Sequence, residues 1–114
     1  MSIERVFKTL EDFGLSRMDA EVYVYLAKKG PQKGCELASA LQVTKQQLYL
    51  SIKNLKDKGA VTVSLERPAL FAAVAFEKVV ELLIAIKVEQ AKAFEETKKE
   101  LMDSWRSINW QEQT

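Results

Sequence analysis

The first forty residues carry apolar side chains at helical spacing. A first helix is predicted by Ile3, Val6, Phe7, Leu10 and Phe13 and should stop at Gly14. Ser16, followed three residues later by Asp19, is typical of a helix N-terminus and predicts a second helix to about residue 29. Gly30 and the proline after it should end that helix. A short third helix is predicted over residues 33–41.

The pattern after residue 42 predicts a fourth helix over residues 45–58. Thr44 and Gln47 have the spacing of a capping box, in which each side chain serves the backbone N–H of the other residue. Leu48, Ile52 and Leu55 follow at helical spacing as one narrow apolar stripe, and Gly59 supplies the stop. Residues 61–65 then alternate between apolar and polar, residues 66–68 form a turn, and residues 69–74 return as a second strand.

No Gly or Pro interrupts residues 76–109, which as one helix would be ~50 Å long. Its apolar positions stay close to a heptad seam: Val79, Leu83, Ile86, Ala93, Leu101, Trp105 and Ile108. Such a stripe needs a partner helix, and a second copy of the chain is the simplest one. The alternative is a helix that folds back along its own domain. Trp105 is predicted to pack within this seam, whereas no role is assigned to Trp110.

Composition removes several kinds of chemistry. The chain has no histidine and a single cysteine, so His-based catalysis and a His or thiolate metal site are excluded. Four dispersed glycines form no phosphate-binding loop, and we expect neither an enzyme nor a cofactor. No apolar run is long enough for a membrane span, no leader is evident, and the lone Cys35 fits a reducing cytoplasm. Cys35 is expected to be semi-buried, with a redox role as the alternative.

The net charge of +1 indicates no particular partner, but its distribution is uneven. Residues 1–75 carry a net charge of +3 and residues 76–114 a net charge of −2. All of the basic excess of the first part falls within residues 42–67. A local basic patch of this kind is typical of a small DNA-binding module, although many charge clusters are only solvated surface.

The outward side of the 45–58 helix carries side chains that can read a DNA major groove. With Leu48 and Ile52 inward, Gln46, Leu50 and Lys53 point outward. Tyr49 and Lys56 flank them on one side, and Gln47 and Asn54 on the other. Glutamine can pair with adenine, lysine with guanine or phosphate, and leucine with a thymine methyl group. Arg67 lies at the predicted hairpin tip, where it could reach the DNA backbone or minor groove. An ordinary solvated helix face and a solvated turn arginine are the alternatives.

Several motifs together resemble the TrmB-like archaeal transcriptional regulators. The matching residues are Gly14-Leu15-Ser16, Asp19-Ala20-Glu21-Val22-Tyr23, Leu26, Gly30-Pro31, Glu36-Leu37-Ala38, Val43-Thr44, Tyr49, Leu55, Lys58-Gly59, Phe71, Ala73-Val74 and Phe76-Glu77-Lys78. The resemblance covers roughly residues 7–80. It implies a winged helix-turn-helix that binds duplex DNA as a dimer, with Lys45, Gln46, Gln47, Tyr49 and Lys53 at DNA-facing positions. Full-length members continue into a sugar-binding domain, so sugar sensing is not expected here. Lys45 stands where the family often has Arg.

These observations predict a mostly α-helical chain with a small β-hairpin. Residues 1–75 form a winged helix-turn-helix, and residues 76–114 form a long dimerisation helix. The expected function is sequence-specific binding of double-stranded DNA by a cytoplasmic homodimer, a transcriptional regulator without a sugar-binding effector domain. The alternative is a winged-helix module for protein–protein interaction whose long helix binds a different chain. Neither a metal nor a membrane partner is expected.

Overall fold

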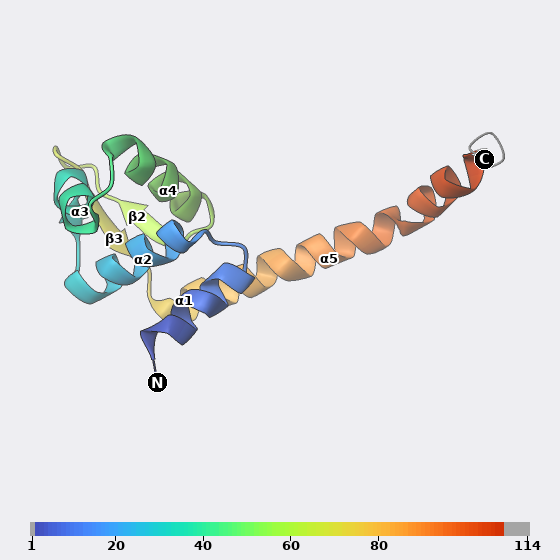
Figure 1. The fold of residues 1–114 in the computed structure, drawn as a ribbon, viewed down its shortest axis with the longest axis horizontal. Helices are drawn as coiled ribbons and strands as arrows, with labels where there is room; N and C mark the ends of the chain where they lie inside the picture. Colours follow the sequence, from blue (N-terminus) through green and yellow to red (C-terminus); the bar gives the residue numbers. More distant parts are fainter. Residues whose placement is uncertain (1, 109–114) are drawn as a thin grey trace. The chain divides into compact units, whose positions relative to one another are not determined.

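The computed structural model describes residues 2–108, which contain five helices and three short strands (Figure 1). In chain order they are α1 (Ile3–Asp12), α2 (Arg17–Lys29), β1 (Gln32–Lys33), α3 (Gly34–Leu41), α4 (Lys45–Asp57), β2 (Val61–Val63), β3 (Leu70–Ala73) and α5 (Phe76–Ser107). The chain divides into two compact units, Met1–Ile84 and Ala85–Thr114. The mostly helical fold with a β2–β3 hairpin and a long last helix confirms the predicted fold class.

The ends of α2 lie where the local sequence predicts them. At its start the Ser16 hydroxyl accepts a hydrogen bond from the Asp19 N–H (3.0 Å), and the Asp19 carboxylate accepts one from the Ser16 N–H (3.2 Å). At its end Gly30 has a φ of 85°, in the left-handed region that favours glycine. The capping pair and the terminal glycine therefore fix the length of α2.

The sheet has one strand more than the predicted hairpin. The strand order is β1-β3-β2, and both pairings are antiparallel. In β1, Gln32 lies opposite Phe71 and Lys33 opposite Leu70. The sequence of β1 is a polar pair without alternation, so only its pairing with the free edge of β3 makes it a strand. The segment after α2 is thereby tied to the hairpin.

The core of the first unit lies where α2, α4 and the start of α5 pack around the sheet. Its largest fully buried side chains are Tyr23, Leu10, Leu26, Leu37, Leu48, Leu55, Leu83, Val22 and Val79. The Tyr23 hydroxyl donates to the Val74 carbonyl oxygen (2.6 Å), and burial raises the pKa of this tyrosine. Val79 and Leu83 are each only 1% exposed. They therefore belong to the core of the single chain, and their predicted place in a dimer seam is corrected.

The Arg17 side chain links α1 to α2 through ion pairs with a glutamate of each helix. Its guanidinium pairs with Glu4 of α1 (2.6 Å) and with Glu21 of α2 (3.1 Å), and it lies 4.2 Å from the centre of the Phe7 ring. The hydrogen bond from Arg17 lowers the pKa of Glu4, and the two carboxylates raise the pKa of Arg17. These groups are largely exposed, so the cluster orients α1 and adds little to stability.

The second unit contains the part of α5 from Ala85 onward. Every residue from 87 to 108 is exposed in the single chain. Large apolar side chains are among them: Val88, Phe94, Leu101, Met102, Trp105 and Ile108. The predicted helix end at residue 109 and the unassigned Trp110 lie outside the described residues. Within residues 2–108, no helix is both long and apolar enough to cross a membrane.

Candidate nucleic-acid interface

Helix α4 presents two different sides, as the apolar stripe predicts. Leu48, Ile52 and Leu55 are at most 4% exposed and hold the helix against the rest of the first unit. On the other side Gln46, Leu50 and Lys53 are exposed, Leu50 by 69%. Most of the Leu50 side chain is left uncovered by residues 2–108. The outward side of α4 is therefore a surface available for contact with another molecule.

Gln47 holds the N-terminus of α4 in the predicted capping box. Its side-chain oxygen accepts a hydrogen bond from the Thr44 N–H (3.0 Å), and the Thr44 hydroxyl accepts one from the Gln47 N–H (3.1 Å). The amide oxygen of Gln47 is thus occupied, whereas its NH2 group makes no hydrogen bond within the described residues. A glutamine that reads adenine needs both its oxygen and its NH2 group. In this conformation the amide oxygen of Gln47 already serves the helix cap, whereas its NH2 group remains available to donate.

Tyr49 packs across the start of α3 and the middle of β3. Its ring meets the Phe71 ring edge-on, with centroids 6.1 Å apart. Gly34 lies beneath the tyrosine hydroxyl so closely that a Cβ atom added at Gly34 would stand 2.8 Å from it. Tyr49 remains 50% exposed. It therefore holds the helix-turn-helix and the sheet together while one edge of its ring faces solvent.

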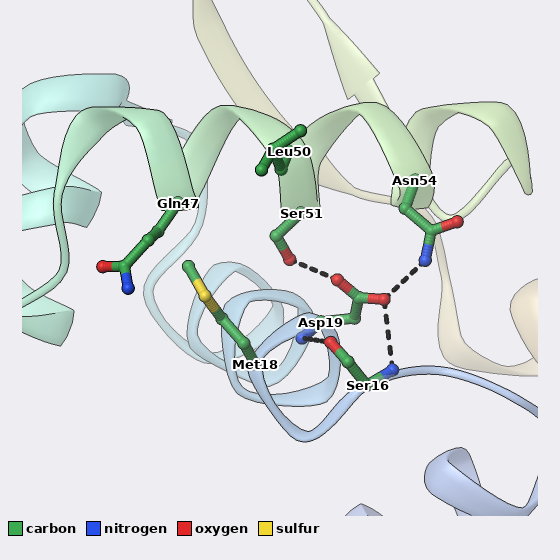
Figure 2. A pocket seen from close by; sticks show the side chains of 7 residues that line it. All are labelled: Ser16, Met18, Asp19, Gln47, Leu50, Ser51 and Asn54. Carbon is green, nitrogen blue, oxygen red and sulfur yellow. Dashed lines mark hydrogen bonds between the residues drawn. The ribbon is translucent and has the colours of Figure 1, made fainter.

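A carboxylate from α2 reaches the side of α4 (Figure 2). The Asp19 side chain accepts hydrogen bonds from the Ser51 hydroxyl and from the Asn54 amide, both at 2.5 Å. Asn54 in turn accepts a hydrogen bond from the Lys58 ammonium (2.6 Å). Asn54, expected on the outward flank, is half-buried and turned toward Asp19 instead, because the carboxylate offers it a strong acceptor.

A hollow of about 350 Å³ opens beside this network. Its lining is drawn in Figure 2 and consists of Ser16, Met18, Asp19, Gln47, Leu50, Ser51 and Asn54. Sequence reasoning missed the network, because Asp19 is separated from Ser51 and Asn54 by more than thirty residues. One signal was present: Ser51 falls on the buried side of α4, among leucines and an isoleucine, where a polar group needs a partner.

The hairpin between β2 and β3 ends in an exposed loop. Ser64 and Leu70 close the loop through hydrogen bonds in both directions, each 2.9 Å long. Arg67 is exposed within this loop, as predicted for the hairpin tip. Leu65 is 101% exposed, which sequence reasoning did not predict. The loop therefore offers one cation and one apolar side chain to a partner.

The basic residues of this region are free to meet an anion. Lys45, Lys53, Lys56 and Arg67 are exposed, and no ion pair within residues 2–108 engages any of them. Lys58 differs, since it is half-buried and bound to Asn54. Four unpaired cations on α4 and its adjoining hairpin, against the exposed carboxylates Asp57 and Glu66, give this part of the first unit a basic excess.

Two further features of the described chain concern its acidic and cysteine side chains. No group of three or more acidic or cysteine side chains between residues 2 and 108 is arranged to hold a metal ion. Cys35 at the start of α3 is exposed, so its expected semi-buried position is wrong. The helix places this residue on its outer side, whereas Leu37 takes the buried position.

Helix α2, the helix pair α3–α4 and the β2–β3 hairpin together define a winged helix-turn-helix. Many transcriptional regulators have this fold. Its solved structural neighbours include a transcriptional regulator from Thermotoga maritima (23% identity, 87% of this chain and 77% of that one, TM-score 0.57). They also include the DNA complex of MepR from Staphylococcus aureus (18% identity, 93% and 90% coverage, TM-score 0.57). At these identities the likeness concerns the fold.

Residues 10–77 match the family described as "Sugar-specific transcriptional regulator TrmB", and the chain belongs to this family. It is 29% identical over 102 residues to the HTH-type sugar sensing transcriptional regulator TrmBL1 of Pyrococcus furiosus, covering 86% of this chain. It also resembles the structure of TrmBL2, an archaeal chromatin protein with a novel mode of DNA binding (27% identity, 91% of this chain, TM-score 0.78). The chain spans 30% of the length of TrmBL1 and 42% of the TrmBL2 chain.

Proposed function

We propose that the chain binds double-stranded DNA in a sequence-specific manner as a homodimer and regulates transcription. The observation that carries this proposal is the outward side of α4 in a TrmB-family winged helix. There, exposed Gln46, Leu50 and Lys53 project from a helix whose other side is anchored by buried leucines. The fold, the unpaired cations and the DNA-binding regulators among similar proteins all favour the same partner.

Each exposed side chain has a role that its chemistry allows. Gln46, which makes no hydrogen bond of its own in the described chain, pairs with an adenine edge, and Leu50 meets a thymine methyl group. Lys45 and Lys53 contact phosphates or guanine as point charges. Gln47 adds a donor only, and Tyr49 contributes its exposed edge. Arg67 on the wing contacts the backbone or the minor groove.

We assign dimerisation to the second unit. Phe94, Leu101 and Ile108 are seven residues apart, and Trp105 lies one turn after Leu101, so these side chains form one stripe along the helix. All four are exposed in the single chain: Phe94 by 75%, Leu101 by 68%, Trp105 by 57% and Ile108 by 41%. Ile86 and Ala93, also predicted for the seam, adjoin the stripe on one side. Two recognition helices in successive major grooves then read half-sites ~34 Å apart.

Selection of duplexes from a random pool tests the proposal without knowledge of the operator. The purified chain is expected to enrich a near-palindromic motif, and the enriched duplex should outcompete a scrambled duplex of the same composition. A Gln46→Ala, Lys53→Ala double variant, folded to the same melting temperature, is the matched control and should enrich more weakly a motif that is relaxed at the position read by Gln46. An unenriched pool with the wild-type chain would contradict the proposal.

A second candidate function is a winged-helix module that binds another protein. The observations in its favour are the exposed apolar side chains of the second-unit part of α5 and the net charge of −2 over residues 76–114. Under this alternative the stripe pairs with a different chain, and the purified protein is a monomer. The mass in solution separates the two, because DNA reading by paired helices needs the homodimer.

A further inference from the structure

We infer that Asp19 is a positioning residue that fixes the rotation of α4 about its own axis, and thereby selects which side chains face the DNA. This inference rests on the proposed function of α4 as the recognition helix. Asp19 is 5% exposed, so it cannot itself touch a DNA duplex. Its influence on recognition must pass through the helix that it holds.

The carboxylate is fixed from one side and holds α4 from the other. Within α2 the Asp19 carboxylate accepts the Ser16 N–H at 3.2 Å, as the acidic member of the capping box. Toward α4 its first oxygen accepts the Ser51 hydroxyl and its second the Asn54 amide. Ser51 and Asn54 are one turn apart on the same side of α4, so the two hydrogen bonds hold the helix at two positions along its axis.

The two hydrogen bonds add a directional constraint on the rotation of α4 to the apolar contacts that hold the helix. Leu48, Ile52 and Leu55 pack through non-directional contacts, which tolerate small rolling motions of a helix. Hydrogen bonds to a carboxylate weaken steeply when distance and angle leave their narrow ranges. A roll of α4 would stretch both contacts at once, since both donors lie on one side of the helix.

The hollow beside the network shows why this constraint is needed. It is lined by Met18 of α2 and by Gln47 and Leu50 of α4, and its volume is about 350 Å³. The hollow is open to solvent between Met18 of α2 and the Gln47 and Leu50 side chains of α4 (Figure 2), so this side of α4 is less tightly packed than the side that carries Leu48 and Leu55. Leu50 and Gln47 would turn into the hollow with such a roll. The Asp19 network is what opposes that motion.

Two buried variants test the inference without removing any DNA contact. Asp19→Asn keeps the size of the side chain but replaces one acceptor by a donor that faces the donors of α4. Ser51→Ala removes one hydroxyl from a residue that is 5% exposed. Ser16→Ala is the matched control, because it removes the cap hydroxyl of α2 and leaves the Ser16 N–H and the α4 contacts in place.

The readout is discrimination between the selected duplex and a duplex with one base pair changed, measured by competition. We expect Asp19→Asn and Ser51→Ala to lower this ratio about fivefold to tenfold while the salt dependence of binding stays that of the wild type. Ser16→Ala should keep the wild-type ratio even where its melting temperature falls. Amide hydrogen exchange without DNA should be faster within residues 45–57 in the first two variants only.

Three results would overturn the inference. Wild-type discrimination and α4 exchange in both Asp19→Asn and Ser51→Ala would show that the network does not set the rotation of α4. An equal loss of discrimination in Ser16→Ala would assign the effect to general stability. If the wild-type chain binds no duplex at all, the proposed function fails first, and faster exchange confined to α4 would then show only a packing role for Asp19.

Discussion

The amide oxygen of Gln47 accepts a hydrogen bond from the backbone N–H of Thr44 at 3.0 Å, and the Thr44 hydroxyl accepts one from the Gln47 N–H at 3.1 Å. This reciprocal cap occupies the atom with which a glutamine would accept the amino group of adenine. The neighbouring Gln46 has no such constraint and is exposed. Of the two adjacent glutamines at the start of α4, Gln47 therefore caps the helix, and Gln46 is the one we propose for base recognition.

Substitution of each glutamine by alanine should separate these roles. Gln47→Ala should lower the free energy of unfolding by about 1 kcal/mol, because the Thr44 N–H loses its partner. Thermal unfolding should show the change as a melting temperature lower by about 4–8 °C. Gln46→Ala should leave the melting temperature unchanged and relax the selected motif at one position. An identical motif from Gln46→Ala would argue against base reading by this residue.

Lys53 and Arg67 are expected to contact phosphates, so their removal should change the salt dependence of binding. For each of Lys53→Ala and Arg67→Ala, the slope of log affinity against log salt should become shallower by about 0.9, with affinity lower for all sequences alike. Lys8→Ala, which removes an exposed lysine from α1, is the matched control and should keep the wild-type slope. Equal slopes in all four proteins would place the phosphate contacts elsewhere.

Gly34 is required by the tyrosine above it rather than by its own backbone. A Cβ atom at this position would lie 2.8 Å from the Tyr49 hydroxyl oxygen and 3.4 Å from the Phe71 ring. Gly34→Ala should therefore destabilise the wild-type chain by about 1 kcal/mol, because overpacking outweighs the better helix propensity of alanine. In a Tyr49→Phe background, where the hydroxyl is gone, the same substitution should be neutral or stabilising. Denaturant unfolding of the four proteins in this cycle provides the test, and equal effects of Gly34→Ala in both backgrounds would contradict it.

Charge placed on the α5 stripe should prevent dimerisation. Leu101→Glu buries a carboxylate in any interface formed by the stripe of Phe94, Leu101, Trp105 and Ile108, so we expect a monomer by sedimentation equilibrium. Lys99→Glu is the control on the opposite side of the helix and should remain a dimer. A dimeric Leu101→Glu variant, or a monomeric wild type, would contradict the assignment of the interface.

Local rules predicted most of the fold and the exposure of part of the candidate site. Both capping boxes, the bounds of α2 and α4, and the exposure of Gln46, Leu50 and Lys53 follow from spacings within one helix. The same reasoning also anticipated the hairpin and the long last helix, because their patterns are continuous along the chain.

The features that sequence reasoning missed depend on contacts between distant segments. Strand β1 exists only by pairing with β3, and Asn54 turns inward only because Asp19 lies opposite it. The predicted seam on α5 includes Val79 and Leu83, but the core of the first unit buries both. The predicted seam lacks Phe94, although its seven-residue spacing to Leu101 places it on the same stripe.

A fluorescence-anisotropy titration of labelled duplex DNA tests the central claim most directly. The duplex selected by the wild-type chain and a scrambled duplex of equal composition are each titrated at 50 and 200 mM salt, together with Lys53→Ala. The account predicts tighter binding to the selected duplex, a loss of affinity of about tenfold or more between the two salt concentrations, and a smaller loss for Lys53→Ala. Equal affinity for both duplexes, or no binding at 50 mM salt, would contradict sequence-specific DNA binding through α4.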